Sequence, residues 1–235
     1  MPAYAGRGIH GQTVETIARR ILTGAIGEGE TIDITGLQSE LGVSLTAVRE
    51  AIKVLTAKGL VDARQKRGTF VRPREEWNLL DGDVIRWQFS GRTDPVFLSN
   101  LNEVRGIVEP AAAKLAAQRR TEADLAALQD ALDGMAVAAD TTAAVQADLD
   151  FHRALLAATH NELLERMEVV IETGLAERDR LVHGADPHDH PVPSHRAVLS
   201  AITDQDAPRA EKAMRALLKK ATRDLKRVSR PTRKD

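Results

Sequence analysis

Apolar residues recur at helical spacing along most of the chain, and one short stretch departs from that pattern. After a Gly-rich arm of residues 1–11, apolar residues mark a first helix that ends near Gly24: Val14, Ile17, Ala18 and Ile21. Beyond Asp94 the chain is rich in Ala, Leu, Glu and Arg, and no alternating strand pattern is evident. The pattern predicts a mainly α protein with one small region of strand.

Residues 37–71 combine two short helices, a tight turn and a hairpin. Gly42 permits a break after the first helix, and Ser44 is placed to cap a second helix of about residues 45–58. Val48, Ile52 and Leu55 form the apolar face of that second helix. Together with the hairpin, this order predicts a winged helix-turn-helix.

The hairpin and the second helix carry an excess of positive charge. Two short runs at 60–61 and 69–71 flank a basic tip at 64–68. Between Ser44 and Arg74 there are eight Lys or Arg and two acidic residues, whereas the whole chain has a net charge of -1. Such local charge is typical of a duplex-DNA binder, with Lys53, Lys66 and Arg67 as candidate contacts. The alternative is the ordinary solvated face of an amphipathic helix.

Caps and helix breakers divide the rest of the chain into six or seven helices. They occur at Thr121, Asp140 or Thr141, Asn161, 184–194 and 204–208. The predicted fold is therefore mainly α, with an N-terminal winged helix-turn-helix and a C-terminal all-α antiparallel helical bundle. Such bundles place ligands between facing helices.

We expect five segments in the chain: an arm (1–11), the winged domain (12–74), a linker helix (75–93), the helical domain (94–229) and a tail (230–235). Apolar residues at helical intervals predict the linker helix, which should pack against one of the domains: Trp77, Leu80, Val84 and Trp87. The chain has no cysteine, no signal-peptide pattern and no run of 18 apolar residues. These features favour a cytoplasmic protein without a membrane partner.

Asp148 and His152 are the main chemical signal in the helical domain. On a helix, residues four apart share a face, so both side chains can approach one divalent cation. His195, which starts a separate helix, could supply a third ligand, whereas Asp150 faces away and is expected to be a surface charge. The alternative is a salt-bridged or capped Asp–His pair without metal.

The sequence resembles the GntR family of bacterial transcription regulators, and specifically its FadR subfamily, over nearly its whole length. The resemblance lies in GVSLTAVREAIKVLTAKGLV, RGTFV, LNEVRGIVEPAAAKLAAQR and ADLDFHRALLAATHN. The segment EEWNLLDGDVIRW resembles the linker of the D-galactonate operon repressor branch. The resemblance implies DNA contacts by Ser44, Thr46, Arg49 and Gly68. Family members often have Arg where this chain has Thr35 and Leu45, so the operator sequence is not expected to be shared.

The resemblance also implies a metal site and an acid-binding arginine. The ligand domain of this subfamily typically uses an Asp and three His; Asp148, His152 and His195 match, but Leu217 stands where the third His would be. A divalent ion (zinc, nickel or manganese) is therefore expected to bind more weakly.

Arg105 matches an arginine that holds an acidic ligand in the family. Its alternative is an i,i+4 pair with Glu109 on a solvated face. Arg223 could approach the same cavity, or it could belong to the basic C-terminal surface.

We therefore expect a homodimeric transcriptional regulator that binds a palindromic operator in double-stranded DNA. It would be a repressor released by a small organic acid, such as the sugar acids galactonate or gluconate. A response to another carboxylate or to metal is the alternative. An enzyme, such as a metal-dependent hydrolase, is disfavoured because no nucleophile motif or phosphate loop is present. An architectural DNA binder would differ in showing no effector-sensitive release.

Overall fold

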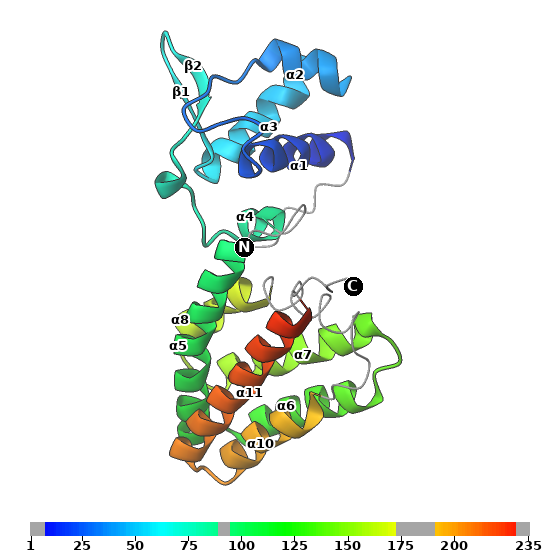
Figure 1. The fold of residues 1–235 in the computed structure, drawn as a ribbon, viewed down its shortest axis with the longest axis vertical. Coiled ribbons are helices and arrows are strands. Elements are labelled where there is room, and N and C mark those ends of the chain that lie inside the picture. The colour runs from blue at the N-terminus through cyan, green and yellow to red at the C-terminus, as the bar shows by residue number, and fades with distance from the viewer. Residues whose placement is uncertain (1–7, 89–94, 173–190, 229–235) are drawn as a thin grey trace, which may run out of the picture. The chain divides into compact units, whose positions relative to one another are not determined.

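The computed structural model describes residues 8–88, 95–172 and 191–228, in two compact units, 1–94 and 95–235 (Figure 1). The predicted mainly α fold, with one small sheet, is confirmed. Helix α1 already begins at Ile9, so residues 9–11 belong to the first helix and not to an arm. The earlier part of the arm, most of the 184–194 loop and the 230–235 tail lie outside the described residues.

The first unit contains α1 (Ile9–Leu22), α2 (Ile34–Leu41), α3 (Leu45–Ala57), β1 (Val61–Arg64), β2 (Gly68–Val71), a 3-10 turn (Arg74–Glu76) and α4 (Gly82–Gln88). The described helices of the second unit are α5 (Pro95–Arg119), α6 (Glu122–Val137), α7 (Thr141–Ala157), α8 (Glu162–Arg166), α10 (Val192–Thr203) and α11 (Ala207–Val228).

Local sequence fixes the helix-turn-helix. The Asp33 side chain accepts hydrogen bonds from the first backbone amides of α2, which satisfies donors that a helix leaves unpaired. Gly42 ends α2 in the left-handed conformation (φ 64°), where a side chain would be strained. Ser44 caps α3 as predicted, accepting from the Ala47 amide at 3.1 Å. The turn between the helices is therefore fixed at both ends.

The core of the first unit lies between α1, α3 and the hairpin. Ile17, Val48 and Leu55 are completely buried there. Each such side chain contributes about 1.5–3 kcal/mol relative to an exposed one. The two strands pair antiparallel, with Val61 opposite Val71, and both of these valines enter the same core. The hairpin is thus anchored at its base while its tip extends away.

The linker segment packs against the first unit. Trp77 and Trp87 are buried in the same core, and α4 contacts α1. The linker helix begins only at Gly82, so Trp77 and Leu80 precede it, and Leu80 is 67% exposed; its predicted end at 93 lies outside the described residues. The expectation that this helix packs against one domain is confirmed, and the domain is the winged one.

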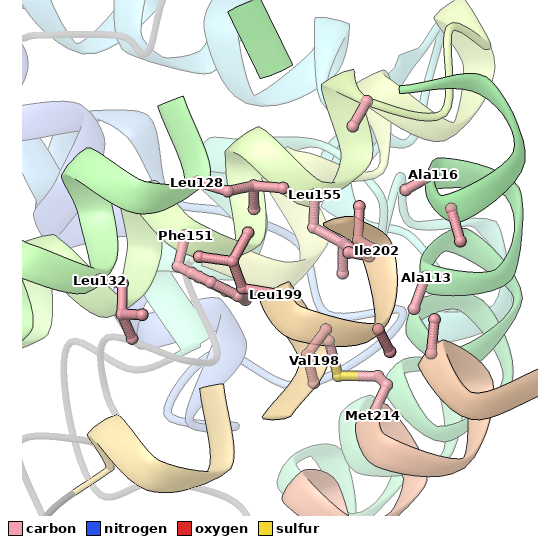
Figure 2. Close-up of a cluster of buried hydrophobic side chains, with 14 of the residues drawn as sticks. Ala113, Ala116, Leu128, Leu132, Phe151, Leu155, Val198, Leu199, Ile202 and Met214 are labelled. Carbon is pink, nitrogen blue, oxygen red and sulfur yellow. The ribbon is translucent and has the colours of Figure 1, made fainter. Parts of the chain in front are cut away.

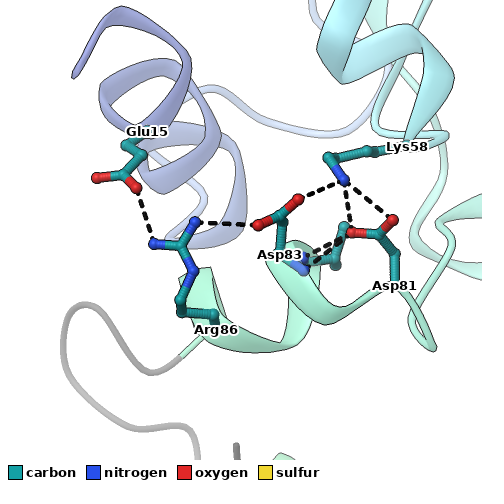
Figure 3. Close-up of polar contacts among 6 residues, drawn as sticks. Glu15, Lys58, Asp81, Asp83 and Arg86 are labelled. Atoms are coloured by element: carbon teal, nitrogen blue, oxygen red, sulfur yellow. Dashed lines mark hydrogen bonds and ion pairs between the residues drawn. The ribbon is translucent and has the colours of Figure 1, made fainter. Parts of the chain in front are cut away.

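Ion pairs connect α4 and the residues just before it to α1 and to the end of α3 (Figure 3). Lys58, which ends α3, lies 2.8 Å from Asp81 and 2.7 Å from Asp83. Arg86 continues the network, at 3.1 Å from Asp83 and 2.8 Å from Glu15 of α1. The network therefore joins α1, the end of α3 and α4 within one unit.

The second unit is a helical bundle throughout its described residues. Figure 2 shows its core, in which α6, α7 and α10 contribute large apolar side chains: Leu128, Leu132, Phe151, Leu155, Val198 and Ile202. Alanines of α5 complete this core and allow a close approach to α11. The predicted caps Thr121, Asp140 and Asn161 each accept a hydrogen bond from the following helix. None of the helices in the described ranges is long and apolar enough to cross a membrane.

Candidate DNA interface and candidate metal site

The exposed face of α3 carries the residues predicted to contact DNA. Thr46, Arg49 and Lys53 are exposed, and Ser44 lies at the N-terminal end of the helix. Lys53 forms an exposed ion pair with Glu50 at 2.7 Å. Arg49 makes no ion pair with any residue that the structure describes. A helix with such a first turn and a free guanidinium is suited to the major groove.

Two basic residues of the hairpin tip, Lys66 and Arg67, have different environments. Lys66 (φ 71°) and Gly68 (φ 79°) both adopt the left-handed conformation, which produces a tight, protruding tip. Arg67 lies over the Phe70 ring, 3.6 Å from its centroid, and donates to the Gly29 carbonyl oxygen at 3.1 Å. Both residues are exposed, but Arg67 is held against the tip by these contacts, and Lys66 makes no ion pair with any residue that the structure describes.

In the second unit, three helices bring acidic and imidazole groups together. Asp148 and His152 lie one turn apart on α7, His195 lies in the first turn of α10, and Glu109 lies on α5. All four side chains are buried. The three predicted metal ligands Asp148, His152 and His195 each present one ligand atom within 4.8 Å of the others.

In both imidazoles Nε2 lies toward Asp148, whereas Nδ1 contacts a different residue. His195 Nδ1 donates to the Pro191 carbonyl oxygen at 2.9 Å, and its Nε2 lies 2.9 Å from Asp148 Oδ1. His152 Nδ1 lies 2.7 Å from Glu109 Oε2, and its Nε2 lies 3.8 Å from Asp148 Oδ2. Metal-binding histidines typically have this arrangement, with one nitrogen held by an outer partner.

The residues present fit a divalent cation. In a neutral His195, the Nε2 lone pair would face a carboxylate oxygen at 2.9 Å, and two electron-rich atoms this close need a proton or a cation between them. Neither buried ring nitrogen of His152 makes a hydrogen bond of good geometry within the described chain: Nδ1 is at ion-pair distance from Glu109, and Nε2 lies 3.8 Å from Asp148 Oδ2. Two imidazoles and a carboxylate suit zinc, nickel or manganese, and they leave coordination positions open. Leu217 is 5% exposed and belongs to the apolar core.

Arg105 and Glu109 form the i,i+4 pair that the spacing allows, but the pair is buried and not solvated. Arg105 is 2% exposed and Glu109 is 0% exposed, and Arg105 Nε lies 2.5 Å from Glu109 Oε1. Burial alone would raise the pKa of Glu109. The neighbouring Arg105 and His152 side chains outweigh burial and lower the pKa of Glu109 to about 2. Glu109 is therefore a buried carboxylate that touches both the candidate acid-binding arginine and a candidate metal ligand.

The structure does not bring Arg223 to this cluster. Arg223 is exposed on α11, and its Nε donates to the Lys219 carbonyl oxygen. Asp150 also lies apart, paired with Arg153 as a surface charge.

Sequence reasoning missed Glu109 as a site residue. The available signal was its position four residues after Arg105 and shortly before the alanine run at 111–113, which places the charged pair close to a small apolar stretch of one helix.

Two family models match the chain, one in each unit. Residues 10–71 match the bacterial regulatory proteins of the gntR family, and residues 100–220 match the FCD domain. The first match spans the helix-turn-helix and the hairpin, and the second contains Arg105, Glu109 and the Asp148 cluster.

Similarity to individual proteins extends over nearly the full chain. The galactonate operon transcriptional repressor of Escherichia coli K12 is 34% identical over 221 residues, which cover 92% of this chain and 96% of that protein. A putative L-lactate dehydrogenase operon regulatory protein of Escherichia coli K12 is 32% identical, covering 77% of this chain and 72% of that protein.

The fold is also that of a solved structure, Lar, which controls the expression of the Listeria monocytogenes agr system. Lar has a TM-score of 0.67 at 18% identity, and the match covers 94% of this chain and 98% of Lar. Fold, motifs and full-length similarity agree: this chain belongs to the GntR family of bacterial transcription regulators and carries an FCD domain as its second unit.

Proposed function

We propose that this protein is a homodimeric repressor whose operator binding is relieved by a small organic acid, with a sugar acid such as galactonate or gluconate as the first candidate. The observation that carries the proposal is the buried Asp148–His152–His195 cluster adjoining the Arg105–Glu109 pair, in a chain that also carries a DNA-binding unit. A guanidinium and a cation with open coordination positions together match a carboxylate with neighbouring hydroxyl groups.

Two findings support the acid class. The similar Escherichia coli protein is a repressor of the galactonate operon, and the other similar protein is connected with an L-lactate dehydrogenase operon. Galactonate and lactate both carry a carboxylate beside a hydroxyl group, which a divalent cation can chelate through two oxygens. A smaller hydroxy acid is therefore the second candidate.

The DNA side of the proposal rests on charge and geometry. Thr46, Arg49 and Lys66 are exposed on α3 and the hairpin tip. A dimer would place two such helices on the half-sites of a palindrome, doubling the contacts. Lys53, Arg67 and Gly68 would support the same interface through charge and hairpin shape.

The test is a titration of the protein with the DNA upstream of its own coding region, followed by fluorescence anisotropy. Galactonate, gluconate, lactate and a dicarboxylate are added in turn, with and without zinc, nickel or manganese. Release by one acid, dependent on metal, supports the proposal. Binding that no acid changes would leave a DNA-binding protein without the proposed sensor.

A further inference from the structure

Glu109 connects the two halves of the candidate ligand site. One of its oxygens lies 2.5 Å from Arg105 Nε, and the other lies 2.7 Å from His152 Nδ1. The carboxylate comes from α5, while His152 comes from α7. Glu109 is completely buried and contacts the Nδ1 side of the His152 ring, whereas Nε2 lies toward Asp148, so Glu109 is placed behind the candidate metal site and outside its group of three ligands.

We propose that Glu109 is a positioning residue: it holds His152 with the proton on Nδ1, so that the Nε2 lone pair faces Asp148 and is available to a cation. This inference rests on the metal site of the proposed function. It assigns a task to a residue that is not among the three candidate metal ligands.

The physical reason is the pairing of lone pairs and protons. A carboxylate accepts hydrogen bonds, so the imidazole nitrogen beside it must carry the proton. In the other tautomer, a lone pair would face Glu109 at 2.7 Å, and a proton would occupy the place of the cation. Removing an outer partner of this type typically weakens metal binding by about 10- to 100-fold.

Arg105 offsets the free-energy cost of burying the Glu109 carboxylate. A buried carboxylate without a compensating charge is strongly unfavourable, and the guanidinium at 2.5 Å supplies that charge. Glu109 is thus shared between the residue proposed to hold the acid and a residue proposed to hold the metal. Any ligand that draws Arg105 away from Glu109 changes the environment of His152 as well.

The test compares the full-length protein with three variants. Glu109→Gln turns one oxygen into an amide donor, so one of its two contacts becomes donor against donor. The double variant Arg105→Met with Glu109→Leu replaces the ion pair by two apolar side chains of similar length. Replacing both partners of a buried ion pair in this way often leaves the stability of a protein unchanged. Asp150→Asn, on the same helix as His152 but outside the cluster, is the matched control. Circular dichroism confirms that each variant is folded.

Two measurements are made. Long-range ¹H–¹⁵N correlation of the metal-free protein at pH 8 reports which nitrogen of His152 carries the proton, and the His152→Asn variant identifies the His152 signals. Competition with a chromogenic chelator gives the affinity for cobalt, whose visible spectrum also reports its ligands.

In the wild type, we expect His152 to carry its proton on Nδ1. In the double variant, the proton should no longer prefer Nδ1 over Nε2. Both Glu109 variants should bind cobalt about 10- to 100-fold more weakly than the wild type. Asp150→Asn should match the wild type. A wild-type proton on Nε2, or folded Glu109 variants with unchanged cobalt affinity, would overturn the role of Glu109. A wild type with the Nδ1 proton that binds no cobalt would instead overturn the metal site itself, and with it the purpose assigned here to Glu109.

Discussion

Three arginines of this chain have different environments, and each environment indicates a different role. Arg49 is exposed on α3, Arg67 is stacked on Phe70 at the hairpin tip, and Arg105 is buried beside Glu109. The guanidinium is charged in all three places. The surrounding atoms decide whether that charge is available to DNA, to the fold or to an internal ligand.

Arg49→Ala should weaken operator binding without weakening the fold. If Arg49 makes a base contact, the loss is about 1 to 3 kcal/mol, roughly 5- to 150-fold in affinity, and specificity relaxes at one position of the half-site. Fluorescence anisotropy with operator and scrambled duplexes measures both effects. Arg215→Ala, which removes an exposed arginine of the helical unit, is the control. Unchanged operator affinity in Arg49→Ala would contradict the role of α3 in recognition.

Arg105→Lys should weaken acid binding while retaining the positive charge beside Glu109. Lysine lacks the planar pair of donors that matches a carboxylate, so we expect at least about a tenfold loss of affinity, near 1.4 kcal/mol. Isothermal titration with the acid that releases the operator measures the loss. Arg223→Lys should bind that acid as the wild type does, because Arg223 lies outside the cluster. Equal acid affinity in Arg105→Lys and the wild type would remove Arg105 from the site.

Among the elements, α4 shows how polar contacts decide where a short helix docks. Lys58 contacts Asp81 and Asp83, and Asp83 is buried. Replacing Lys58 by Met leaves that carboxylate with one cation fewer, so the first unit should lose about 1.5 to 3 kcal/mol of unfolding free energy. Both tryptophans of the chain are buried in this unit. Urea unfolding followed by tryptophan fluorescence therefore reports the loss directly.

Lys53→Met is the matched control for Lys58→Met, because Lys53 forms an exposed pair and its loss should be barely measurable. Equal fluorescence-detected stabilities of Lys58→Met and Lys53→Met would contradict the structural role of the network.

The same ion pairs predict a pH dependence of the first unit. Burial by itself lowers the pKa of Lys58, but the hydrogen bonds and charges of Asp81 and Asp83 outweigh burial and raise the pKa above its ordinary value of 10.5. Lysine is then stabilised in its charged form by folding. Its contribution is fully present below pH 10.5 and is lost as the pH rises through the folded-state pKa. The difference between wild type and Lys58→Met in fluorescence-detected unfolding should therefore shrink in alkaline solution, and a constant difference would argue against the pairing.

The elements could be predicted from sequence to different degrees. The caps Ser44, Thr121 and Asn161 were predictable because a capping side chain acts on amides within three residues of itself. The docking of α4 was not, since an apolar spacing shows which face is buried and not which partner buries it. Likewise, the spacing of Arg105 and Glu109 predicted a pair, but their burial depends on helices far away in the sequence.

For the whole molecule, the proposed function requires that acid binding in the second unit be coupled to operator binding by the first unit. If an acid bound near Arg105 weakens operator binding by some factor, operator DNA must weaken acid binding by the same factor, because both describe one coupling free energy. Coupling free energies of this kind are typically about 1–3 kcal/mol, or 5- to 150-fold.

This coupling is tested by two measurements on the metal-loaded protein, one of operator affinity and one of acid affinity. Operator affinity is measured by anisotropy with and without saturating acid, and acid affinity is measured by titration calorimetry with and without excess operator duplex. We expect both ratios to agree within error and to lie in the range of about 5 to 150. A scrambled duplex should change acid affinity less, since its contacts are mainly to phosphates. If acid binding is identical with and without operator, the acid does not release the protein from DNA, however tightly each ligand binds alone. Two equal ratios above 1 would show that acid and operator are coupled through one free energy, as the proposed release requires.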